Sequence, residues 1–99
     1  MWLTLIRARR AIRALCPGTK VISFGATDID PQYLAIWIKT RTDERRDQLA
    51  RNPILIEQIR EALLKVGYPP VAVPKVLINF ESQETVDRDY KGQWFLRFK

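Results

Sequence analysis

Residues 33–41 have the sequence Tyr33-Leu34-Ala35-Ile36-Trp37-Ile38-Lys39-Thr40-Arg41. Side chains in such a stretch alternate between two faces when the chain is a β-strand. One face is mainly aliphatic and carries Leu34, Ile36, Ile38 and Thr40. The other face combines aromatic rings with cations, from Tyr33, Trp37, Lys39 and Arg41. We therefore expect the first face to contact the core, and the second to need either a cover or a binding partner.

The segment before this strand predicts a second strand. Residues 19–27 are rich in Val, Ile and Phe, which favour strands, and Gly25 marks either a bulge or close packing. The turn of residues 28–31 contains Asp28, Asp30 and Pro31, which are typical turn residues. Two strands joined by so short a turn predict an antiparallel hairpin.

The N-terminal residues 1–16 have helical periodicity, and Pro17-Gly18 ends the helix. Its polar face carries only cations: Arg7, Arg9, Arg10 and Arg13. We favour a helix that covers one face of the sheet and leaves these arginines in water. The alternatives are an organellar transit peptide, or an arm that binds a membrane surface or nucleic acid.

A second helical region follows the central strand. Thr42 is a typical N-cap, and Asn52-Pro53 interrupts the helix and restarts it. Apolar residues recur at helical spacing over residues 53–66, and Gly67 ends this segment. We expect one interrupted helical region over residues 42–66.

The C-terminal third predicts two more strands. Residues 76–81 alternate, the polar residues 81–90 form a loop with a short helical turn capped by Ser82, and residues 93–99 alternate again. The order αββαββ predicts an α+β fold: a four-stranded, mostly antiparallel sheet with two helices on one face, in a single domain of residues 1–99. The residues expected to be most buried are Ile36, Ile59, Leu63, Ile78 and Leu96.

Composition excludes several classes of site. The 99 residues contain one cysteine and no histidine, so a zinc site, a Cys-His pair, a Ser-His-Asp triad and an intramolecular disulfide are all excluded. Glycine-rich phosphate-binding loops are also absent from the sequence. We expect no cofactor, no resident metal and no enzymatic activity. A single cysteine favours a reducing, cytoplasmic location, and no apolar run approaches the ~20 residues of a membrane span.

The second sheet face is the main candidate binding surface, and comprises Tyr33, Trp37, Lys39, Arg41, Phe95 and Arg97. Aromatic residues and arginine are enriched at protein–protein hot spots. The polar loop would add Glu81, Glu84, Asp87, Arg88 and Asp89. These residues predict a small interaction domain that binds a protein partner or forms a homodimer. If the N-terminal helix or loops cover the rings instead, no exposed patch remains.

Two further functions are alternatives. A nucleic-acid-binding module would stack bases on Trp37 and Phe95 and use the basic N-terminal helix. Residues 21–99 carry twelve Lys/Arg against eleven Asp/Glu, so most of the net charge of +6 belongs to that helix. A metal-dependent phosphoester hydrolase would need a carboxylate cage, for which the candidates are Asp28, Asp30, Glu81, Glu84, Asp87 and Asp89.

Overall fold

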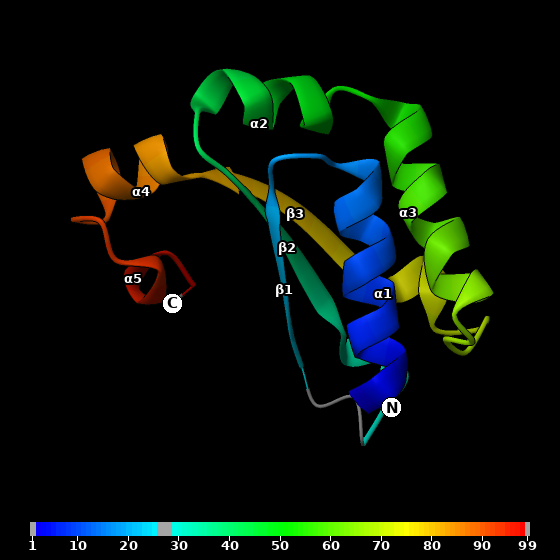
Figure 1. Ribbon diagram of the computed structural model, residues 1–99. Coiled ribbons are helices and arrows are strands. Elements are labelled where there is room, and N and C mark those ends of the chain that lie inside the picture. Colours follow the sequence, from blue (N-terminus) through cyan, green and yellow to red (C-terminus); the bar gives the residue numbers. More distant parts are fainter. Residues whose placement is uncertain (1, 26–28, 99) are drawn as a thin grey trace.

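The computed structural model describes residues 2–25 and 29–98 (Figure 1). Along the chain the elements are α1 (Trp2–Leu15), β1 (Lys20–Phe24), a 3-10 turn (Pro31–Tyr33), β2 (Ala35–Thr40), α2 (Asp43–Ala50), α3 (Pro53–Lys65), a second 3-10 turn (Val73–Lys75), β3 (Leu77–Ser82), α4 (Gln83–Asp89) and α5 (Trp94–Phe98). The fold is therefore α+β. Among these described helices, none has both the length and the apolar character needed to cross a membrane.

The described strands form a three-stranded mixed sheet in the order β1-β2-β3. β1 and β2 are antiparallel, as the predicted hairpin requires, but β2 and β3 are parallel. The predicted four-stranded, mostly antiparallel sheet with two helices on one face is wrong. Helices α2 and α3 connect β2 to β3 as a crossover that returns the chain to the end where β2 began, and a strand that starts there runs parallel to β2.

The second error concerns the C-terminus, because residues 94–98 form helix α5 instead of a fourth strand. So short a segment fits the period of a strand or of a helix. Trp94 and Phe98 are four residues apart and share one helical face, with their ring centroids 5.8 Å apart. The ring of Phe98 also packs on Trp37, 5.1 Å between centroids, so α5 lies on a face of the sheet and does not extend its edge.

The helix caps agree with the sequence. Thr42 Oγ1 accepts a hydrogen bond from the Arg45 backbone N–H, and Asn52 Oδ1 accepts from those of Ile54 and Leu55. Asn52 therefore caps α3 as predicted, and it separates α2 from α3 into two distinct helices.

The main core lies between one face of the sheet and helices α1 and α3 (Figure 1). Ile36, Ile59 and Leu63 are fully buried there as predicted, whereas Ile78, on the edge strand β3, and Leu96, on α5, are only half-buried. Helix α1 contributes the buried residues Ala8 and Ile12, and Cys16 directly after it is buried as well. The helix thus covers the sheet, as the favoured interpretation of residues 1–16 expects.

Candidate binding face

The strand register determines which side chains share the face opposite the core, since partners in register project to the same side. These are Lys20, Ile22 and Phe24 on β1, Ala35, Trp37 and Lys39 on β2, and Leu77, Asn79 and Glu81 on β3. Helix α5 lies on this face, on the side of the sheet opposite α1 and α3 (Figure 1). We call this surface the binding face; α5 divides it into an aromatic end near Phe24 and a cationic end near Lys39.

Helix α5 is too short to be stable alone, so tertiary contacts must hold it. The Phe98 ring packs edge-on against Phe24, with the centroids 4.8 Å apart, and tilted against Trp37. The Arg97 guanidinium lies 4.8 Å from the centroid of the Trp37 ring, and Arg97 Nε donates to Glu81 Oε2 at 2.5 Å. The helix is thus anchored by ring packing on the sheet and by an ion pair to β3.

The aromatic end is an open cavity of about 640 Å³ lined by Phe24, Ala35, Trp37, Phe95 and Phe98, which we call the aromatic cavity. All five of these described residues are apolar, and four of them carry rings. Phe95 is 64% exposed, and Leu77, paired with Ala35 in the sheet, is exposed as well. An apolar surface of this kind on a small domain is typical of an interaction site.

The predicted residues of this face separate into groups. Trp37 and Phe95 meet in the aromatic cavity, and Arg97 stacks on Trp37. Lys39 and Arg41 line a different pocket at the cationic end. Tyr33 lies in the 3-10 turn before β2, where it is exposed and does not line the aromatic cavity. The rings and the cations are therefore neighbours on one face but do not form a single patch.

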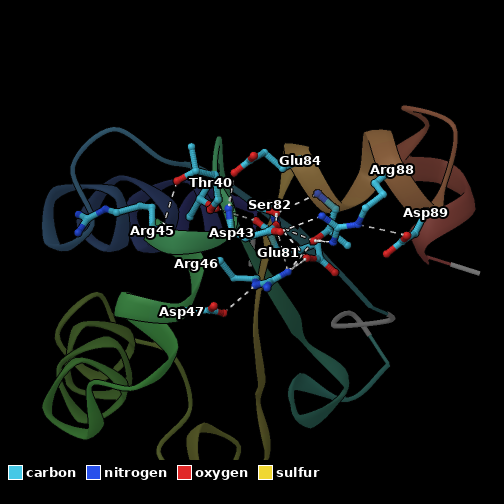
Figure 2. Close-up of polar contacts among 12 residues, drawn as sticks. Thr40, Asp43, Arg45, Arg46, Asp47, Glu81, Ser82, Glu84, Arg88 and Asp89 are labelled. Carbon is cyan, nitrogen blue, oxygen red and sulfur yellow. Dashed lines mark hydrogen bonds and ion pairs between the residues drawn. The ribbon is translucent and has the colours of Figure 1, made fainter.

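The predicted polar loop is the end of β3 followed by the whole of α4, and Glu81 is its most buried acid at 5% exposed. Glu81 accepts hydrogen bonds from Arg46 Nη1 at 2.9 Å and from the Ser82 backbone N–H (Figure 2). It also accepts one from Arg97 Nε. Burial alone would raise the pKa of Glu81, but these hydrogen bonds hold it below its usual value. Glu81 is therefore charged at neutral pH.

Asp43 joins the first turn of α2 to the first turn of α4 (Figure 2). Its carboxylate accepts hydrogen bonds from Ser82 Oγ, from Thr85 Oγ1 at 2.7 Å and from Arg88 Nη1 at 3.1 Å. In return, Glu84 Oε1 accepts a hydrogen bond from the Asp43 backbone N–H at 2.8 Å. The hydroxyl hydrogen bonds, first from Ser82 and then from Thr85, hold the pKa of Asp43 well below its usual range.

These contacts bear on the carboxylate-cage hypothesis. Asp87 accepts a hydrogen bond from Gln83 Nε2, Asp89 pairs with Arg88 at 3.4 Å, and Asp30 accepts from Gln32. Within residues 2–25 and 29–98, no group of three or more potential ligands is arranged to hold a metal ion, and Asp28 lies outside the described residues. These three acids are engaged by neighbouring side chains of their own segments, so the hydrolase hypothesis gains no support from their geometry.

The arginines of α1 lie apart from the binding face. Arg7, Arg10 and Arg13 are exposed, and Arg9 is half-buried. Arg9, Arg10 and Arg13 line a small hollow with Ile6 and Val21. Because α1 packs on the side of the sheet opposite α5 (Figure 1), its arginines and the rings of the binding face do not form one surface. A nucleic-acid strand would have to pass around the sheet to use both.

Among the aromatic residues of the binding face, sequence reasoning missed Phe24, Trp94 and Phe98. The signal for Phe24 was present, because the hairpin register places it on the same face as Ala35 and Trp37. The signal for the other two was their spacing of four residues, which puts both rings on one side of a helix. Comparison of the chain with protein-family models, with curated proteins and with solved structures finds no significant match.

Proposed function

We propose that this chain is a non-enzymatic interaction domain that binds a bulky apolar side chain of a protein partner, or of a second copy of itself, in the aromatic cavity. The observation that carries this proposal is the lining of the cavity, which is apolar at all five described positions. Burying apolar surface contributes about 25 cal/mol per Å². A site lined mainly by apolar groups gains most from an apolar ligand.

The rigidity of the cavity supports the same function. Phe98 contacts three other rings, and Arg97 is fixed between Trp37 and Glu81. Walls held in this way lose little conformational entropy when a ligand binds, which favours affinity. Aromatic anchors of this kind are also the residues most often found at hot spots.

Self-association is the first test. Light scattering coupled to gel filtration, over a range of concentrations, would measure the mass of the wild type and of Phe95→Ser. We expect the wild-type mass to rise with concentration and the mass of the variant to stay that of a monomer. The matched control is Ile54→Ser, because Ile54 on α3 is 62% exposed, close to the 64% of Phe95, but lies outside the aromatic cavity.

A wild type that stays monomeric would direct the test to foreign partners. A displayed library of peptides, each with a central Leu, Phe or Trp, would then be selected on the wild type. The proposal requires peptides whose affinity falls at least tenfold with Phe95→Ser and is unchanged with Ile54→Ser. Finding neither self-association nor such peptides would refute it.

A further inference from the structure

A second pocket lies at the cationic end of the binding face, between the turn that follows α1, the ends of β1 and β2, and helices α4 and α5. Its volume is about 360 Å³. The residues that line it are Gly18, Thr19, Lys20, Lys39, Thr40, Arg41, Gln83 and Trp94, and we call it the cationic pocket. These described lining residues include three cations and no carboxylate.

The positive charge of this pocket is not compensated within the described part of the chain. Lys20 and Lys39 are partners in the β1–β2 register, an arrangement of like charges that destabilises a sheet. Glu81 is the partner of Lys39 on the other side, but its carboxylate is bonded to Arg46 and Arg97. Among residues 2–25 and 29–98, neither lysine nor Arg41 forms an ion pair. Burial, and then the charge of Lys20, lower the pKa of Lys39.

The neutral walls are fixed by hydrogen bonds of their own. Thr19 Oγ1 donates to the Cys16 carbonyl at 2.6 Å, and Thr40 Oγ1 donates to the Thr42 carbonyl at 2.9 Å. Trp94 Nε1 donates to Gln83 Oε1 at 2.7 Å. The Lys39 ammonium lies 4.4 Å from the centroid of the Trp94 ring, which orients it but does not neutralise it. The pocket is thus preorganised and lacks only a negative charge.

We propose that the cationic pocket binds the phosphomonoester or pyrophosphate group of a small molecule between Lys20, Lys39 and Arg41. Such a group carries about two negative charges at neutral pH. Three cations that line one pocket match that charge density better than the single charge of a phosphodiester in a nucleic-acid strand. Arginine adds the paired N–H donors that bind phosphate oxygens. This site is separate from the aromatic cavity and does not depend on the function proposed for it.

The test measures binding of inorganic phosphate and of pyrophosphate to the full chain by calorimetry and thermal shift, at constant ionic strength. We expect saturable binding, tighter for pyrophosphate, and a rise in the melting temperature. Lys39→Gln should weaken the affinity for pyrophosphate about tenfold or more, because it removes one charge-assisted contact. The matched control is Lys75→Gln, which removes the same charge from an exposed lysine outside the pocket and should leave the affinity within twofold.

Two further readouts separate a binding role from other roles. Without ligand, Lys39→Gln should melt close to the wild type, because relief of the repulsion from Lys20 offsets the lost contact with the Trp94 ring. A much lower melting temperature would show that Lys39 serves stability and would overturn the proposal. Phe95→Ser should bind pyrophosphate normally. Three results would each overturn the proposal. They are the absence of saturable binding, equal losses of pyrophosphate affinity with Lys39→Gln and Lys75→Gln, and tighter binding of a single-stranded oligonucleotide than of pyrophosphate.

Discussion

Glu81 shows at the scale of one residue how the binding face is assembled. Its carboxylate is buried, and it holds Arg46 of α2 on one side and Arg97 of α5 on the other. Removing one member of a buried ion pair leaves a charge without its partner, which is far costlier than losing an exposed pair. Because Arg97 also stacks on Trp37, Glu81 positions a wall of the aromatic cavity that it does not itself line.

Asp43 and Glu81 make stability depend on pH. The pKa of each is lower in the folded protein than the ordinary values of 3.8 and 4.5, so the unfolded chain takes up protons first as the pH falls. Their contribution is therefore complete above about pH 5 and is lost as the pH falls through and below those ordinary values. Urea unfolding of the wild type at pH 7, 5, 4 and 3 should show a free energy of unfolding that decreases over this range.

The variant Asp43→Asn separates the contribution of Asp43 to this pH dependence from that of Glu81. It should be less stable than the wild type at pH 7, because the amide bonds less strongly to Ser82, Thr85 and Arg88. Its stability should fall less steeply between pH 5 and pH 3, since one of the two titrating groups is gone. The same steepness in both proteins would show that Asp43 does not contribute to the acid sensitivity. Glu57→Gln, on the exposed side of α3, is the control and should match the wild type at every pH.

At the scale of elements, local signals predicted most of the fold. The alternation of residues 33–41 gave β2, and the caps at Thr42 and Asn52 gave the starts of α2 and α3, because these signals lie within a few residues of what they determine. The direction of β3 depends on a crossover of more than thirty residues, and the identity of α5 depends on rings of Phe24 and Trp37 far away in sequence. The periodicity of apolar residues determines neither the direction of a strand nor contacts between residues far apart in sequence.

Gly25 gives a prediction for the turn between β1 and β2. Its φ is +130°, and a Cβ at this position would lie 2.1 Å from the Tyr33 carbonyl oxygen. Of the two predicted roles of Gly25, a bulge or close packing, the structure thus shows close packing, against the Tyr33 backbone. Gly25→Ala must therefore move the backbone, and should lower the free energy of unfolding by more than about 1–2 kcal/mol, the cost of the left-handed conformation alone.

Gly67→Ala is the matched control for this prediction. Gly67 also has a positive φ, +93°, but a Cβ there would meet no atom within 4 Å. Gly67→Ala should lower the free energy of unfolding only by the cost of the left-handed conformation, about 1–2 kcal/mol. Chemical denaturation of both variants provides the comparison, and equal losses would mean that the Tyr33 backbone moves aside at little cost.

At the scale of the whole molecule, the sequence predicted a binding face but not its division. Trp37 and Lys39 lie on the sheet face opposite the core, where strand alternation placed them. Phe95 and Arg97 reach this face from helix α5 and not from the predicted fourth strand. The separation of the face into an aromatic cavity and a cationic pocket arises from α5, which lies between the two. The structural role of Glu81 could not be predicted from the sequence, because Arg46, which pairs with its carboxylate, lies 35 residues away along the chain.

The packing of α1 predicts how the stability of the whole molecule responds to substitutions on the apolar face and on the charged face of this helix. Ile12 is 0% exposed and lies in the core cluster, so Ile12→Ala should cost about 2–5 kcal/mol, a large share of the stability of a domain this small. The exposed arginines at positions 7, 10 and 13 are three residues apart, a spacing at which like charges repel. Replacing all three by Gln should therefore leave the free energy of unfolding unchanged or slightly higher.

Thermal and urea unfolding, followed by circular dichroism, measures the stability of Ile12→Ala and of the variant with all three arginines replaced. A chain that lacks residues 1–16 is measured beside them, because this deletion removes the whole helix. The deletion removes Ala8, Ile12 and Cys16 from one core, and should abolish cooperative unfolding because the sheet then exposes the face that α1 covers. A truncated chain that melts like the wild type would mean that α1 is a detachable arm. A loss of stability on neutralising the arginines, with none from Ile12→Ala, would mean that the charged face, and not the apolar one, holds the helix in place.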